Sequence, residues 1–145
     1  MHLIGFDPGK DKCGIALIEV LATDYRILCQ EVVEASASLA VLEQLGTNYP
    51  ITELILGNQT LSKSWQRRIS ERMPDLNIIV VDERSSSQEA RQRYWDLYPA
   101  RGCQRLVPRG MRTPPRPIDD IVALILLERY LLERYLLPLP GKSFL

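Results

Sequence analysis

Four carboxylates stand where short apolar runs end or where a long one begins, and their placement is the first sign of chemistry in the sequence. Asp7 follows the first apolar run, Glu83 follows a later one, and Asp119 and Asp120 precede a long apolar stretch. Carboxylates gathered at one place repel each other when ionised, unless a cation lies between them. Mg²⁺ and Mn²⁺ prefer oxygen ligands, and a pair of such ions can activate water for phosphodiester cleavage.

Each carboxylate also has an explanation that involves no chemistry. Asp7-Pro8-Gly9 is ordinary turn sequence, and Glu83 can pair with its neighbour Arg84. Asp119 can cap a helix and Asp120 can favour its dipole. Because neighbouring residues of a helix point about 100° apart, these two aspartates cannot both face one site squarely. The apolar turns that follow do not choose between them, so both stay candidates.

The elements around these carboxylates predict an α/β fold. The first apolar run, a glycine-containing turn and a second run form a hairpin, and Tyr25–Val33 adds a third antiparallel strand. Strands and helices then alternate, which implies parallel strands joined by crossovers. The expected elements after the meander are a helix from Ser36 or Ser38 to about Gly46, a doubly covered strand over Glu53–Gly57, a helix from a Thr60 cap to about Met73, a strand over Asn77–Val81, and a helix from the capping box Ser86–Glu89 to about Tyr98.

This arrangement predicts where the carboxylates meet. If the first strand is central and the later strands run parallel to it, Asp7 and Glu83 emerge at the same edge of the sheet. The last helix, expected from Pro117 or Ile118 to about Leu137, can bring its first turn to that edge. We therefore expect one domain over residues 1–137, followed by a loosely held tail over residues 138–145.

A long, basic segment separates the last two helices. Prolines and glycines between Pro99 and Pro117 exclude regular structure there, and long loops inside compact domains are usually functional or disordered. Seven arginines lie between Arg91 and Arg116, against one acidic residue, Asp96. Such a segment suits nucleic-acid phosphates, although the formal net charge of the chain is zero. The candidate phosphate contacts are Lys10, Arg84, Arg105, Arg109, Arg112 and Arg116, and the candidate stacking rings are Tyr94, Trp95 and Tyr98, of which Trp95 and Tyr98 have burial in the core as the alternative.

Composition excludes several other classes. Charges interrupt the longest apolar region, Ile121–Leu139, so no membrane span is expected. No signal peptide is visible, which predicts a cytoplasmic protein. Cys13 and Cys29 are expected to be buried apolar residues, and Cys103 lies in the polar segment, with no metal-binding spacing among the three.

Three blocks of the sequence resemble the YqgF (RuvX) family of resolvase-like and pre-16S rRNA processing nucleases, within the RNase H-like superfamily. The resemblance runs from about Leu3 to Leu131, and its middle block is the most specific. The matching residues are Ile4-Gly5-Phe6-Asp7-Pro8-Gly9 with Gly14-Ile15-Ala16, then Val81 to Arg91, and finally Ile118-Asp119 with Ala123 and Ile125 to Leu131.

The resemblance implies an RNase H-like, five-stranded mixed sheet flanked by helices. It also implies that Asp7, Glu83 and Asp119 are catalytic carboxylates that hold Mg²⁺ or Mn²⁺, and it prefers Asp119 to Asp120, which stays open as an additional ligand. One segment departs from the family. Where the family usually has Gly-Leu-Pro, this chain has Gly57-Asn58-Gln59-Thr60, which puts the usual substrate contact there in doubt.

Three classes of function remain. The leading hypothesis is a metal-dependent endonuclease that acts on structured RNA or branched DNA, in pre-16S rRNA processing or Holliday-junction resolution. Junction cleavage would need a homodimer, for which the surface at Tyr130–Tyr135 is the candidate interface. The alternative is a nucleic-acid-binding protein of the same fold with a weak or silent site. A sugar kinase or actin-like ATPase would share the Asp-Pro-Gly phosphate loop, but the chain is too short for a two-domain cleft.

Overall fold

A mixed five-stranded sheet forms the centre of the protein. The computed structural model describes residues 1–135. The strand order is β3-β2-β1-β4-β5, with the first three antiparallel and with β4 and β5 parallel to β1. The predicted topology, with the first strand in the middle, is therefore confirmed. The strands are β1 (His2–Asp7), β2 (Lys12–Val20), β3 (Tyr25–Glu34), β4 (Ile51–Gly57) and β5 (Asn77–Val81).

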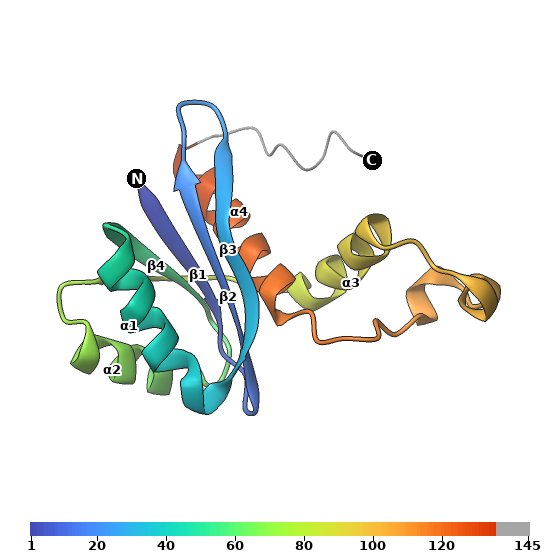
Figure 1. Cartoon of the computed structure of the whole chain (residues 1–145), viewed down its shortest axis with the longest axis horizontal. Helices are drawn as coiled ribbons and strands as arrows, with labels where there is room; N and C mark the ends of the chain where they lie inside the picture. Colours follow the sequence, from blue (N-terminus) through green and yellow to red (C-terminus); the bar gives the residue numbers. More distant parts are fainter. Residues whose placement is uncertain (136–145) are drawn as a thin grey trace.

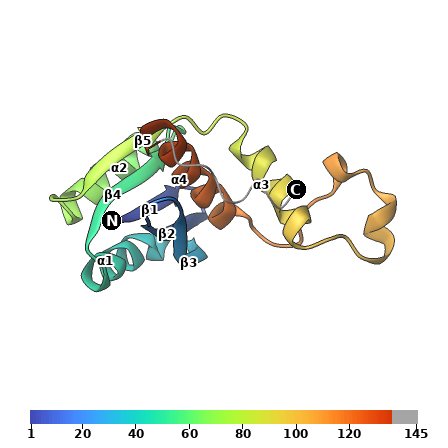
Figure 2. The ribbon, with the colours of Figure 1, turned by 90° about the horizontal axis from the view of Figure 1, so that it is seen from above.

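Helices cover both faces of the sheet (Figures 1 and 2). Helices α1 (Ser38–Asn48) and α2 (Ser62–Arg72) lie on one face, and α4 (Asp119–Tyr135) lies on the other. Successive side chains of β4 point into different layers, since Leu54 and Leu56 pack towards α1 and α2 while Ile55 packs towards α4. All three are fully buried, each worth about 1.5–3 kcal/mol. This double coverage explains why the apolar run of β4 is continuous rather than alternating.

Two glycines let α4 lie directly on the sheet. A Cβ atom at Gly14 would stand 1.8 Å from the backbone oxygen of Asp119, and one at Gly5 would stand 2.3 Å from that of Ala123. Gly14 pairs with Asp7 across the hairpin. The absence of a side chain at Gly14 therefore brings the first turn of α4 down beside Asp7.

A projecting arm separates the last strand from the last helix. The arm consists of α3 (Ser86–Leu97) and the segment 98–117, and Figure 1 shows it extending away from the sheet. It contacts the N-terminal half of α4 through a cluster that includes Tyr94, Trp95 and Ile121. The prediction of no regular structure in this segment is wrong in detail, since two short 3₁₀ helices form at Gly102–Leu106 and Arg109–Met111. Turns of this length fit between the prolines.

The predicted helix caps are wrong. The N-cap residues of α1 and α2 are Ala37 and Leu61, and neither makes a side-chain capping bond. At α3 the N-cap is Ser85, in a left-handed conformation with φ of 61°, and the Ser86–Glu89 capping box does not form. Charge explains this last miss, because the Glu89 carboxylate pairs with arginines of α3 and α4 rather than with the backbone.

The predictions for the cysteines, for Tyr130 and for the last helix are confirmed only in part. Cys13 is buried as predicted, Cys29 is half-buried and Cys103 is exposed. Tyr130 is buried and donates a 2.7 Å hydrogen bond to Glu53, so it offers no surface to a second subunit. The last helix begins at Asp119, slightly later than expected. Its predicted end at Leu137 and the tail 138–145 lie outside the described residues, and no helix within residues 1–135 is long and apolar enough to span a membrane.

Candidate active site

Asp7, Glu83 and Asp119 converge at one edge of the sheet. Asp7 is the last residue of β1 and only 5% exposed, Glu83 follows β5, and Asp119 opens α4. Burial, the negative charges of Asp119 and Glu83, and a hydrogen bond with the Asp119 carboxylate together raise the pKa of Asp7 to about 8. The three candidate carboxylates are thus close enough to oppose one another's ionisation.

Two oxygen atoms at this edge lack a partner. Asp7 Oδ1 and Glu83 Oε2 are buried and accept no hydrogen bond from any described residue. A Cβ atom at Gly57 would stand 2.2 Å from Glu83 Oε2. The absence of a side chain at this last residue of β4 therefore leaves space for the Glu83 carboxylate. Unsatisfied buried carboxylate oxygens are costly, and a hard cation would satisfy them.

The oxygen ligands that Asp7, Glu83 and Asp119 offer therefore fit Mg²⁺ or Mn²⁺, although they do not form a complete coordination site by themselves. Within residues 1–135, no three Asp, Glu, His or Cys side chains stand at the mutual distances of a formed metal site. Hard ions of this kind usually keep several waters and take one or two protein carboxylates, with substrate phosphate completing the shell. The three carboxylates are thus suited to an ion that arrives together with a phosphate.

Asp119 and Asp120 have different surroundings. Burial is the main cause that raises the pKa of Asp119, whose side chain meets Asp7. The Asp120 carboxylate instead accepts hydrogen bonds from Gln30, at 3.2 Å, and from Arg116, at 2.9 Å. The structure thus brings Asp119 to Asp7 and directs Asp120 towards β3 and the base of the arm.

The departure from the family pattern lies directly against Glu83. Asn58 Oδ1 accepts a 3.3 Å hydrogen bond from the backbone N–H of Glu83. Burial and the charge of Asp82 raise the pKa of Glu83 to about 7, while the Arg129 guanidinium opposes that rise. Sequence reasoning missed both Asn58 and Arg129, and only the Asn58 position carried a signal, as a polar residue where an apolar one is usual.

The cationic candidates fall into two groups. Lys10 and Arg84 are exposed and stand within three residues of Asp7 and one residue of Glu83, respectively. The other four belong to the arm, where Arg109 pairs with Asp96 and Arg116 pairs with Asp120. Arg105 and Arg112 donate only to backbone oxygens and have no carboxylate partner among the described residues. The arm therefore offers Arg105 and Arg112 most readily to phosphates.

A groove of about 680 Å³ lies between β3 and the base of the arm, on the side to which Asp120 points. Lys12, Tyr98 and Asp120 line it. Tyr98 is 53% exposed, whereas Tyr94 and Trp95 are buried in the cluster against α4. Of the three predicted stacking rings, only Tyr98 lies where a base can reach it, and burial as a core residue is confirmed for Trp95 but wrong for Tyr98.

Curated relatives cover most of the chain. A protein of Xanthomonas oryzae pv. oryzae named "Putative pre-16S rRNA nuclease" is 29% identical over 141 residues, which span 89% of this chain and 86% of the relative. A protein of the same name from Xanthomonas axonopodis pv. citri is 26% identical with the same coverage. No protein-family model matches the chain.

The resemblance to the YqgF (RuvX) family is confirmed. Solved structures agree on the fold. RuvC from Thermus thermophilus, in complex with a Holliday junction substrate, superposes with a TM-score of 0.54 at 16% identity, covering 92% of this chain and 96% of RuvC. A second structure of the same RuvC gives a TM-score of 0.52. The expected RNase H-like fold is therefore confirmed as well.

The charge repulsion at Asp7 leads to a prediction about stability. The ordinary pKa of this carboxyl is 3.8, and the folded value is about 8. Between these values the folded protein retains a proton that the unfolded chain has lost, so this group's contribution to stability falls as the pH rises from about 4 to 8. Without metal, Asp7→Asn is therefore expected to raise the free energy of unfolding at pH 8 by at least about 1 kcal/mol, and to change it little at pH 4.

Urea unfolding in EDTA at both pH values measures this difference. Saturating Mg²⁺ should shrink the advantage of Asp7→Asn, because an ion bound by carboxylates stabilises the wild type more than the variant. An Asp7→Asn variant that is less stable than the wild type at pH 8 in EDTA would contradict the prediction.

Proposed function

We propose that the protein is a divalent-metal-dependent endonuclease that hydrolyses phosphodiester bonds in structured nucleic acid. The observation that carries the proposal is the convergence of Asp7, Glu83 and Asp119, with two buried oxygens that lack partners. The name of the Xanthomonas relatives supports precursor 16S rRNA as a substrate. The Holliday junction bound to RuvC supports branched DNA as the other candidate.

Each carboxylate has a place in this mechanism. Mg²⁺ or Mn²⁺ would supply an activated water and stabilise the leaving oxygen. Asp7 would be a metal ligand together with Glu83 and Asp119. Because the pKa of Asp7 is raised, its carboxyl would release a proton on binding a cation at neutral pH. The exposed Lys10 and Arg84 would hold the phosphates on either side of the cleaved bond.

We propose that the arm holds the substrate away from the cleaved bond. Arg105 and Arg112 would contact backbone phosphates, and Arg109 and Arg116 would join them if their present ion pairs opened. No base-reading motif accompanies these arginines, so the shape and backbone of the substrate would be recognised rather than its sequence. We also propose a cytoplasmic location, where such a substrate would be met, and a homodimer if the substrate is a four-way junction.

The salt dependence of binding tests the arm. An Arg105→Gln/Arg112→Gln double variant is expected to bind a structured substrate more weakly and to flatten the slope of log K against log salt by about 1.5, since each phosphate contact accounts for about 0.7–0.9. Fluorescence anisotropy in EDTA at several salt concentrations measures both effects. The matched control is Arg26→Gln/Arg72→Gln, which removes two exposed arginines outside the arm. An equal change of slope in both double variants would contradict the arm's role.

Cleavage assays test the proposed reaction itself. Purified protein is incubated with precursor 16S rRNA and with a four-way DNA junction, in Mg²⁺, Mn²⁺ or EDTA, alongside Asp7→Asn and Glu83→Gln. We expect cleavage of at least one substrate by the wild type with metal, none in EDTA, and severe loss in both variants. Binding without metal-dependent cleavage would favour the alternative, a binding protein with a silent site. Cleavage that survives both substitutions would refute the site assignment.

A further inference from the structure

The peptide group between Asp82 and Glu83 is held from both sides by side chains of other elements. Its carbonyl oxygen accepts a 3.0 Å hydrogen bond from Arg129 Nη1 of α4. Its N–H donates to Asn58 Oδ1, just beyond the end of β4, at 3.3 Å. The same peptide group thus has its acceptor and its donor occupied by two separate parts of the fold.

We propose that Arg129 and Asn58 are positioning residues that clamp this peptide group and so fix where the Glu83 carboxylate points. This inference rests on the proposed nuclease function of Glu83. The segment needs such support, because β5 ends at Val81 and the sheet ladder offers nothing to the residues that follow. Within the turn itself, the backbone N–H of Ser86 donates a 2.9 Å hydrogen bond to the main-chain carbonyl oxygen of Glu83, and Ser85 adopts the left-handed conformation.

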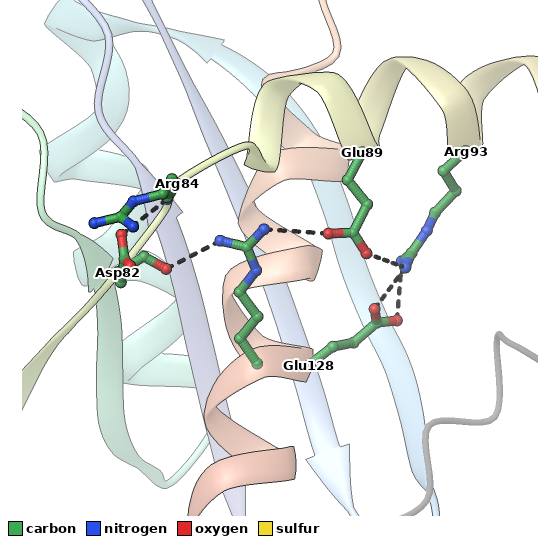
Figure 3. Close-up of polar contacts among 6 residues, drawn as sticks. Asp82, Arg84, Glu89, Arg93 and Glu128 are labelled. Carbon is green, nitrogen blue, oxygen red and sulfur yellow. Dashed lines mark hydrogen bonds and ion pairs between the residues drawn. The ribbon is translucent and has the colours of Figure 1, made fainter.

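Arg129 is itself held in place by a network that reaches across the fold (Figure 3). Its second amino group donates to Glu89 of α3 at 3.2 Å. Glu89 also pairs with Arg93, and Arg93 makes two bonds of 2.9 and 2.7 Å to the buried carboxylate of Glu128. Glu128 further accepts a 2.5 Å bond from the Tyr25 hydroxyl on β3. The guanidinium of Arg129 therefore has fixed partners on both sides, which suits a planar, bidentate donor.

The network also connects the arm to the site. Glu89 and Arg93 belong to α3, which begins three residues after Glu83, and Figure 3 shows both side chains turned towards α4. Arg129 donates at once to Glu89 of α3 and to the main-chain carbonyl oxygen of Asp82. One side chain therefore holds both the base of the arm and the backbone at Glu83. The clamp also accounts for the unusual Asn58, whose amide oxygen supplies a bond that an apolar side chain at that position cannot make.

Three variants and a control test the clamp. Arg129→Met and Asn58→Leu each remove one of the two hydrogen bonds to the Asp82–Glu83 peptide group, and Arg129→Met also removes the bond to Glu89. Arg129→Lys retains the charge and a single donor group. Arg26→Met is the control, since it removes an exposed pair with Glu19 that touches neither α3 nor α4. Hydrogen exchange of a peptide covering residues 82–89, the Kd for the substrate in EDTA, and kcat and KM in metal are measured for each.

We expect Arg129→Met and Asn58→Leu to speed exchange over residues 82–86 and to lower kcat by about 10–100-fold, the usual effect of losing a group that orients a metal ligand. Kd and KM should stay within about twofold, and Arg129→Lys should recover part of kcat. Unchanged exchange, unchanged kcat, or an equal loss of Kd and kcat would overturn the clamp. If the wild type cleaves nothing, the nuclease proposal fails on its own, and the exchange data still decide whether the clamp exists.

Discussion

An Asp119→Asn variant is expected to cleave the preferred substrate about 10³-fold more slowly than the wild type, whereas Asp120→Asn should lose no more than about threefold. The difference follows from the partners of the two side chains. Asp119 lies against Asp7, where an ion would bind, while Asp120 is already engaged by Gln30 and Arg116. Single-turnover cleavage in saturating Mg²⁺ measures both variants under conditions where the chemical step is observed.

The two aspartates also differ in what else they disturb. Asp120→Asn should lower thermal stability slightly, because it removes the ion pair with Arg116, whereas Asp119→Asn should leave the metal-free protein as stable as the wild type or more so. Asp119→Asn should thus be the less active but the more stable of the two variants, so a loss of cleavage in Asp119→Asn cannot be attributed to unfolding. Equal losses of cleavage in the two variants would show that Asp120 is a ligand too.

Arg93→Met is expected to lower the free energy of unfolding by about 3–5 kcal/mol. Arg93 provides two charge-assisted hydrogen bonds to Glu128, which is only 3% exposed. Without Arg93, the buried carboxylate of Glu128 would retain, among the described residues, only the Tyr25 hydroxyl as a hydrogen-bond partner. Removing one member of a buried pair is costly because the remaining charge cannot return to water.

Urea unfolding of three variants beside the wild type isolates this effect. Arg26→Met removes an exposed pair and should cost less than about 1 kcal/mol. The double variant Arg93→Met/Glu128→Leu should be more stable than Arg93→Met alone, since it removes the orphaned charge as well. A double variant that is less stable than Arg93→Met would show that packing at this site, rather than charge burial, determines the loss.

Much of the sheet could be predicted because its signals are local. The apolar runs of β1 and β4 and the β-branched run of β5 each identify a strand without reference to the rest of the chain. The alternation of strand and helix then constrains the order, and chain direction alone brings Asp7 and Glu83 to one edge. The choice of Asp119 came from the resemblance, because the apolar first turns of α4 contain no periodicity that distinguishes it from Asp120.

The parts that escaped prediction depend on contacts between distant segments. The Ser86–Glu89 capping box fails because Glu89 meets Arg129, a residue 40 positions away. The sequence suggested only that Asn58 puts a substrate contact in doubt, because its hydrogen bond joins it to Glu83, a residue 25 positions away. Trp95 lies on α3 and Tyr98 follows three residues later as its C-cap, yet only the packing of α4 decides that one is buried and the other exposed.

The placement of the arm has an evolutionary consequence. The arm leaves the sheet after Glu83 and returns at Asp119, and its buried apolar residues form their own cluster with the start of α4. Among the residues that the structure describes, the clusters on the two faces of the sheet contain none from the arm. Insertions, deletions or exchanges in segment 98–117 can therefore accumulate without disturbing the sheet cores. Under the proposed function, such a layout would let substrate binding change while the candidate active site stays the same, so segment 98–117 is the place where we would introduce a new specificity.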